Sequence, residues 1–85
     1  MRVLFSRRFD KDYKKALPAV QTAFQEHLKL FVYNPFDPSL NNHALKGVYL
    51  GKRSINITGD WRALYEEKEG AAYFVTFGTH SQLYG

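Results

Sequence analysis

The sequence contains no cysteine, and its three histidines are widely separated. Without cysteine, the chain can form no disulfide framework, no thiolate metal site and no cysteine nucleophile. His27, His43 and His80 do not have the spacing of a zinc-binding pair, and no glycine-rich phosphate loop is present. We therefore predict that the protein works without a metal ion or a cofactor.

Long apolar segments are also missing. No run approaches the ~20 apolar residues that span a bilayer. The beginning of the chain, from Met1 to Arg8, is apolar too briefly for a signal peptide. Together with the lack of cysteine, these absences predict a cytoplasmic protein with no membrane partner.

Positively charged side chains are present in excess. The 12 lysines and arginines outnumber the 8 aspartates and glutamates, which gives a net charge of +4. Such a surface attracts polyanions, including nucleic acid, although a solvated basic face has the same composition. With 45% hydrophobic residues, the chain of 85 residues is predicted to fold as one small domain over residues 1–85.

Hydrophobic spacing predicts two adjacent helices near the start of the chain. After a short strand at 3–6, apolar residues recur at helical spacing from residue 8 to residue 17. Pro18 cannot continue this helix, but it suits the first turn of a second helix, which is predicted to run to about residue 33. The two helices form a hairpin whose apolar stripes face one way.

The second half of the chain is predicted to form strands, after a loop at 34–42 that is rich in proline and asparagine. Three runs have β character, with turn signals between them: 52–58, 61–66 and 72–77. The order β-α-α-β-β-β predicts a two-layer α+β domain. In it, the N-terminal strand and the helical hairpin pack on one face of a small, mostly antiparallel, four-stranded sheet. The other face is left as a shallow groove with basic groups at its rim.

Polar residues at and beside these strands exceed what a sheet requires, and they suit metal-free cleavage of RNA. That reaction needs a base for the 2′ proton, a cation for the charge on phosphorus and an acid for the leaving 5′ oxygen. His43, Asp60 and His80 could provide the proton transfers. Arg62 could hold a phosphate through two parallel hydrogen bonds. Further candidates for contacts to phosphate or base are Lys46, Lys52, Arg53, Tyr49, Trp61 and Tyr84.

Several of these residues also have a purely structural interpretation. Asp60 fits a hairpin turn, Trp61 fits the core, and the segment 79–81 fits the cap of a final helical turn. Arg62 lies within a strand, where an unpaired charge is costly if it is buried, so it must reach water, an acidic side chain or a ligand. Spacing alone leaves these alternatives open.

Three short segments resemble known proteins. The ending Gly-Thr-His-Ser-Gln-Leu-Tyr at 78–84 resembles the Gly-Thr-His-Ser-Asp-Leu-Phe ending of YafQ-type bacterial toxins. The run Asp-Trp-Arg-Ala-Leu-Tyr at 60–65 resembles a strand found across the RelE/ParE toxin superfamily. The segment Asn-His-Ala-Leu-Lys-Gly at 42–47 is similar to the His-x-Leu-x-Gly segment of that family. The resemblance covers essentially the whole chain.

This resemblance implies the toxin of a type II toxin–antitoxin pair, with the RelE-like form of the α+β fold described above. It further implies ribosome-dependent, metal-free cleavage of mRNA and neutralisation by a cognate antitoxin. By position, His43, Asp60 and His80 match the catalytic residues of YafQ-type toxins, and Arg62 matches the phosphate-binding arginine of RelE-type enzymes. The matching aromatic positions of the same site are Trp61 and Tyr84.

Two positions depart from the YafQ pattern. Asn56 stands where these toxins have a histidine, and Thr76 stands where they have an arginine. Asn56 can still form hydrogen bonds to RNA, but it cannot transfer protons at neutral pH. Two alternatives to the nuclease therefore stay open: a ParE-like toxin that binds DNA gyrase, and a catalytically impaired homologue that binds an antitoxin.

Overall fold

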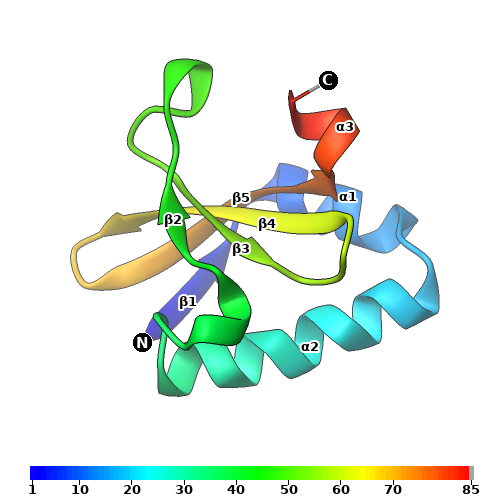
Figure 1. Ribbon diagram of the computed structural model, residues 1–85, viewed down its shortest axis with the longest axis horizontal. Coiled ribbons are helices and arrows are strands. Elements are labelled where there is room, and N and C mark those ends of the chain that lie inside the picture. The colour runs from blue at the N-terminus through cyan, green and yellow to red at the C-terminus, as the bar shows by residue number, and fades with distance from the viewer. Residues whose placement is uncertain (85) are drawn as a thin grey trace.

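The fold is built on one five-stranded sheet with two helices across one of its faces. The computed structural model describes residues 1–84. In chain order, its strands and α-helices are β1 (Arg2–Phe5), α1 (Arg7–Lys15), α2 (Pro18–Tyr33), β2 (His43–Ala44), β3 (Arg53–Asn56), β4 (Trp61–Lys68), β5 (Ala71–Thr79) and α3 (His80–Tyr84). Short 3₁₀ turns at Pro38–Leu40 and Gly47–Tyr49 lie before and after β2. In Figure 1, α2 lies below the sheet, whereas α3 and the loop between β2 and β3 rise above it.

The strands follow the order β1-β5-β4-β3-β2 across the sheet. β1 is parallel to β5, and the other neighbours are antiparallel. The predicted α+β class, with the helical hairpin on one face, is confirmed. The sheet has five strands and not the predicted four, because His43 and Ala44 pair with Ser54 and Arg53 as an additional edge strand. A two-residue strand is too short to show an alternating hydrophobic pattern, so it could not be predicted from hydrophobic spacing.

The boundaries of the helical hairpin follow from capping and from proline. The Ser6 hydroxyl accepts a hydrogen bond from the Phe9 N–H at 3.0 Å and caps α1. The residues just before Pro18 are extended, as expected ahead of a proline, and Pro18 begins α2. Three hydrogen bonds then join the helices, one of them from the Gln25 amide to the Tyr13 hydroxyl at 2.9 Å. The Tyr13 hydroxyl donates to the Gln21 carbonyl at 3.2 Å, and the Gln21 side chain donates to the Tyr13 carbonyl at 2.9 Å.

The core lies between the hairpin and the sheet, and phenylalanine dominates it. The ring centroids of Phe9 and Phe24 are 5.2 Å apart, and those of Phe31 and Phe74 are 5.3 Å apart. Alternate residues of β3 and β4 complete the core from the sheet, namely Ile55, Ala63 and Tyr65. Because successive strand residues point to opposite faces, the residues between these are presented to the open face. No described helix has the length and apolarity needed to cross a membrane.

Candidate active site

The open face of the sheet carries polar residues in two rows that run across the strands. The register pairs His43 of β2 with Ser54 of β3, and it pairs Asn56 of β3 with Arg62 of β4. Residues directly paired in antiparallel strands point to the same face. Ile55, between Ser54 and Asn56, points into the core. The strand register therefore gathers these polar side chains in one area, on the side away from α1 and α2.

The last helix brings further residues to this area. Thr79 and Gln82 cap α3 reciprocally: the Gln82 N–H donates to the Thr79 hydroxyl at 3.2 Å, and the Thr79 N–H donates to Gln82 Oε1 at 2.9 Å. The His80 N–H donates to the Asp60 carbonyl at 2.8 Å and fastens α3 to the turn between β3 and β4. A Cβ added at Gly78 would lie 3.1 Å from Gln82 Oε1, so glycine lets α3 pack closely on β5. The helix is thus folded back over the open face.

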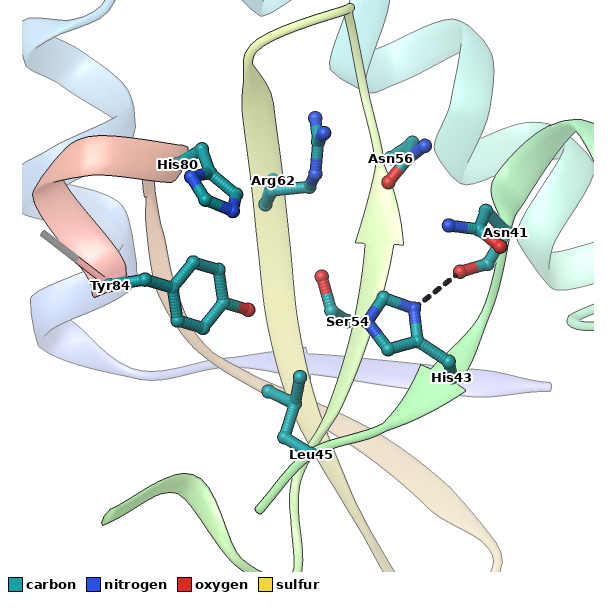
Figure 2. A pocket seen from close by; sticks show the side chains of 8 residues that line it. All are labelled: Asn41, His43, Leu45, Ser54, Asn56, Arg62, His80 and Tyr84. Carbon is teal, nitrogen blue, oxygen red and sulfur yellow. Dashed lines mark hydrogen bonds between the residues drawn. The ribbon is translucent and has the colours of Figure 1, made fainter. Parts of the chain in front are cut away.

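Together these elements border an open cavity of about 370 Å³, which is within the size range of small-ligand sites. It is lined by Asn41, His43, Leu45, Ser54, Asn56, Arg62, His80 and Tyr84. Figure 2 shows His43 and His80 on opposite sides of this cavity, with Arg62 between them. The nuclease interpretation requires His43, Asp60, Arg62 and His80 in one groove. Both histidines and Arg62 line this cavity, whereas Asp60 does not. Two imidazoles and a guanidinium from distant parts of the chain face one space.

Arg62 is held by main-chain oxygens. Its guanidinium donates to the carbonyls of Thr58 and Trp61, each at 3.0 Å, and to the carbonyl of Gly59 at 3.3 Å. Over residues 1–84, the side-chain ion pairs are Arg8–Asp12, Lys52–Glu66 and Lys68–Glu66. Neutral carbonyls fix the direction of the Arg62 guanidinium without cancelling its charge. That charge therefore remains available to a bound anion.

The ring of His43 is held with a defined proton position. Its Nδ1 lies 2.8 Å from the main-chain oxygen of Asn41. Because a carbonyl can only accept, Nδ1 carries a proton and donates it. In the neutral ring, Nε2 is then free to accept a proton from a ligand. Asn41 supplies this carbonyl from a left-handed backbone conformation, with φ 46°, which asparagine tolerates.

His80 and Tyr84 lie one helical turn apart on α3, with ring centroids separated by 4.9 Å. Tyr84 also meets Tyr49 edge-on at 5.7 Å, and the Tyr49 hydroxyl donates to the Leu83 carbonyl at 2.9 Å. Tyr49 belongs to the loop between β2 and β3. That loop therefore braces α3 across the open face, and Tyr49 has a bracing position outside the cavity lining.

Two other predicted site residues, Trp61 and Arg53, point to the helix-covered face. The Trp61 ring packs 5.1 Å from the Phe77 ring, and Arg53 Nε donates to Asn42 Oδ1 at 2.7 Å. Strand alternation explains both positions, because each residue is two places from a buried core residue of its own strand. Neither side chain lines the cavity.

The remaining predicted residues lie around the cavity without lining it. Lys52 pairs with Glu66 at 3.9 Å, and Lys46 is exposed in the loop between β2 and β3. Asp60 is exposed and is connected to the site through its carbonyl, which holds the His80 N–H. Thr76 is 5% exposed and lies opposite Leu64 in the sheet.

The third histidine, His27, does not line the cavity. His27 lies on α2, where its Nδ1 is 2.8 Å from the Ala23 carbonyl of the same helix. Within residues 1–84, no three His, Cys, Asp or Glu side chains lie close enough to share a metal ion. The side chains that gather at the cavity are thus suited to proton transfer and anion binding.

Three lining residues were not among the predicted ones: Asn41, Leu45 and Ser54. Ser54 could have been found, because it alternates with Asn56 on a predicted strand. Asn41 and Leu45 flank the two-residue strand β2, where no periodic signal exists. These two side chains reach the cavity only because of the path that the chain takes on either side of β2.

Comparison with known proteins agrees with this architecture. Residues 1–85 match the family model described as the bacterial toxin of type II toxin–antitoxin system, YafQ. No curated protein sequence gives a significant match.

Solved structures give the same result for the fold. YafQ from E. coli strain BL21(DE3) is 24% identical, with a TM-score of 0.82 and 100% coverage of both chains. A chain of the E. coli DinJ–YafQ toxin–antitoxin complex is 24% identical, with a TM-score of 0.79, covering 98% of this chain and 96% of that one. A YoeB/ParE toxin from Agrobacterium tumefaciens is 19% identical, with a TM-score of 0.76, covering 94% of this chain and 99% of the toxin.

Proposed function

The chain belongs to the YafQ family of bacterial toxins of type II toxin–antitoxin systems, and we propose that it is an endoribonuclease that cleaves mRNA on the ribosome without a metal ion. One observation carries this proposal. His43, Arg62 and His80 come from β2, β4 and α3, and they line the same cavity. These are the base, cation and acid that cleavage by a 2′-hydroxyl needs. A target on the ribosome implies action in the cytoplasm.

The first half of the reaction uses His43 and Arg62. The substrate phosphate binds at the Arg62 guanidinium, whose orientation is fixed by carbonyls of the turn between β3 and β4. His43 Nε2 accepts the proton of the 2′-hydroxyl, while its Nδ1–H stays bonded to Asn41. The 2′ oxygen then forms a bond to phosphorus, and Arg62 stabilises the negative charge that develops on the phosphoryl oxygens.

The second half uses α3. The bond from phosphorus to the 5′ oxygen breaks, and His80 donates a proton to that oxygen, which leaves a 2′,3′-cyclic phosphate and a 5′-hydroxyl. The Tyr84 ring, 41% exposed, offers a stacking surface for a base beside His80. We assign Asp60 a positioning role for His80, because its main-chain carbonyl accepts the hydrogen bond from the His80 N–H. The lysines Lys46 and Lys52 and the residues Arg53 and Trp61 lie outside this reaction.

A cognate antitoxin is the proposed protein partner. The related E. coli structures include complexes described as DinJ–YafQ toxin–antitoxin complexes. The net charge of +4 favours an antitoxin segment with acidic side chains. Such a segment would cover the basic rim of the cavity or the helical hairpin.

The proposal is tested by expressing the chain in cells, with and without His80→Gln, and mapping mRNA 5′ ends on ribosomes. We expect growth arrest and new mRNA ends with the wild type, and a loss of cleavage by about 10²–10⁴-fold in the variant. Co-expression of the neighbouring antitoxin should restore growth. Growth arrest without new ends would instead favour a ParE-like action on gyrase, and no arrest at all would indicate an impaired toxin.

A further inference from the structure

The proposed base, His43, belongs to the shortest strand of the sheet. β2 has two residues, and within residues 1–84 it pairs with β3 at two positions, from His43 and Ala44. The His43 side chain is exposed, so core packing does not hold it. An edge strand of this length opens easily, because few buried contacts and hydrogen bonds resist its opening. Another contact must therefore hold the start of β2 in place.

Asn42, the residue just before β2, provides this contact through its side-chain amide. Its Nδ2 donates to the Pro35 carbonyl at 2.9 Å and to the Tyr65 hydroxyl at 2.7 Å. Its Oδ1 accepts from Arg53 Nε at 2.7 Å. The orientation of the amide is unambiguous, because a carbonyl only accepts hydrogen bonds and an arginine only donates them. One half-buried amide thus joins the preceding loop to β3 and to the buried ring of β4.

The neighbours of Asn42 in the chain are the two residues that define the state of the base. On one side is Asn41, whose carbonyl accepts the hydrogen bond from His43 Nδ1 at 2.8 Å, as the dashed line in Figure 2 shows. On the other side is His43 itself. Because successive residues of an extended chain point to opposite faces, Asn42 is bonded on the helix-covered face while His43 lines the cavity. Fixing Asn42 therefore fixes both the donor and the acceptor of the bond to Nδ1.

We propose that Asn42 is a positioning residue for His43. Its amide bonds hold the chain so that the Nδ1 proton of His43 stays directed at the Asn41 carbonyl and Nε2 remains free to accept the 2′ proton. This inference rests on the proposed function and adds a residue that acts through His43 without contacting RNA. Asn42 does not itself line the cavity.

The test follows the ring nitrogen signals of the purified chain by NMR at alkaline pH, where the imidazoles are neutral. In the wild type, His43 should carry its proton on Nδ1. In Asn42→Ala the Asn41 carbonyl is no longer held, so the ring should exchange between its two neutral tautomers and the two nitrogen shifts should move toward each other. His27 is the internal reference, because its Nδ1 bonds the Ala23 carbonyl within α2 and its signals should not change.

Cleavage of ribosome-bound mRNA is the second measurement. Asn42→Ala should lower kcat by about 10²-fold through displacement of the base. KM should stay within about twofold, since Arg62 still binds the phosphate. Tyr65→Phe removes one partner of Asn42, so it should lower kcat by about threefold to tenfold and shift the His43 nitrogens in the same direction. The double variant should lose no more than Asn42→Ala alone, because the Tyr65 hydroxyl acts through Asn42.

Two control variants separate positioning from a general effect on the loop. Asn34→Ala is the same substitution in the same loop, where Asn34 Oδ1 accepts from the Phe36 N–H at 3.2 Å. It should leave kcat and the His43 signals unchanged. Arg53→Gln removes one of the three Asn42 bonds, and the two that remain should preserve both measurements.

The proposal is overturned if His43 lacks the Nδ1 proton in the wild type or keeps it in Asn42→Ala. An equal loss of kcat in Asn34→Ala, or additive losses in the double variant, would overturn it as well. If the His27 signals also change, Asn42→Ala is unfolded, and Tyr65→Phe, which keeps the packed ring, decides in its place. A wild type that does not cleave mRNA removes the nuclease alone, because the tautomer of His43 still shows whether Asn42 positions it.

Discussion

The two faces of the sheet differ in how completely their side chains are partnered. On the helix-covered face, Tyr65 packs between Phe31 at 5.0 Å and Phe74 at 5.4 Å, and its hydroxyl is bonded to Asn42 at 2.7 Å. On the open face, the buried oxygens of Ser54 and Asn56 have no hydrogen-bond partner among residues 1–84. β3 contributes to both faces, because Ile55, between Ser54 and Asn56, belongs to the core.

This difference assigns separate tasks to the two faces. The free energy of unfolding of a small domain is only about 5–15 kcal/mol, so the cost of leaving buried polar groups unpaired is a substantial fraction of it. The aromatic face therefore provides most of the stability, which offsets the cost of the unpaired polar groups on the open face. Changes on the covered face should therefore act through folding, and changes on the open face should act through binding and rate.

The largest effect is expected on the covered face, from Phe74→Ala. Phe74 is 0% exposed and contacts the rings of Phe9, Phe31 and Tyr65. Its truncation should lower the free energy of unfolding by about 3–5 kcal/mol, measured by urea denaturation. The matched control is Tyr73→Ala, which removes the partly exposed neighbouring ring on β5. Equal losses for the two variants would contradict the separation of the faces.

The next largest effect is expected from Arg62→Gln on the open face, and Arg53→Gln on the covered face is its control. Arg62→Gln should slow cleavage of ribosome-bound mRNA by about 10²–10³-fold, because a cation aimed at the phosphate is lost. Arg53→Gln should leave the rate unchanged and lower the free energy of unfolding by about 1 kcal/mol, since Arg53 bonds Asn42 and lies 5.2 Å from the Phe36 ring. Similar rate losses in both variants would show that phosphate contacts extend around the sheet edge.

These arginines also show which features the sequence could predict. Alternation along β3 and β4 predicts Ser54, Asn56 and Arg62 on one face. The same rule assigns Arg53 and Trp61 to the covered face, although the charge of Arg53 and the ring of Trp61 would also suit contacts to RNA.

The other parts of the site depend on contacts between distant segments. His43 reaches the cavity because a two-residue edge strand pairs with β3, and a strand of that length has no periodicity to detect. His80 reaches it because α3 folds back, through its capping pair and the bond to Asp60. Residue type made both histidines candidates and the resemblance to YafQ-type toxins matched them to catalytic positions, but physical patterning alone could not bring them to one cavity.

A smaller effect is expected from Gly78→Ala, which tests the placement of α3 on the open face. The new Cβ would lie 3.1 Å from Gln82 Oε1 and 3.4 Å from Leu83 Cδ2. Gln82 is exposed and flexible, so the fold should survive, but its cap on Thr79 would be displaced. We expect cleavage to fall about tenfold through misplacement of His80, with a nearly unchanged melting temperature.

Gly59→Ala is the matched control, because no atom lies within 4 Å of the added Cβ. The carbonyl of residue 59 would still accept its bond from Arg62. An equal rate loss in both variants would mean that the turn and α3 are disturbed together, and that Gly78 has no special role.

The smallest effect is expected from Asp37→Ala, in the loop between α2 and β2, and it is a change in the pH dependence of stability. The pKa of Asp37 is lowered because its carboxylate accepts hydrogen bonds from the Ser39 main-chain N–H at 3.0 Å and from the Ser39 hydroxyl at 2.8 Å. A carboxyl with a lowered pKa in the folded state stabilises the fold at pH above its ordinary value of 3.8. That contribution is lost as the pH falls through the folded-state pKa. Asp37→Ala should therefore be slightly less stable than the wild type at pH 7, and this difference should shrink in acid.

Urea denaturation of both proteins at neutral and acidic pH measures this difference. The turn capped by Asp37 runs directly into Asn41 and His43, so it connects a loop anchored on the covered face to His43, the proposed base, on the open face. If the difference between the proteins is the same at both pH values, the charge of Asp37 contributes nothing. If it shrinks as expected while the cleavage rate of Asp37→Ala at pH 7 stays at the wild-type level, the turn stabilises the loop without setting the position of His43.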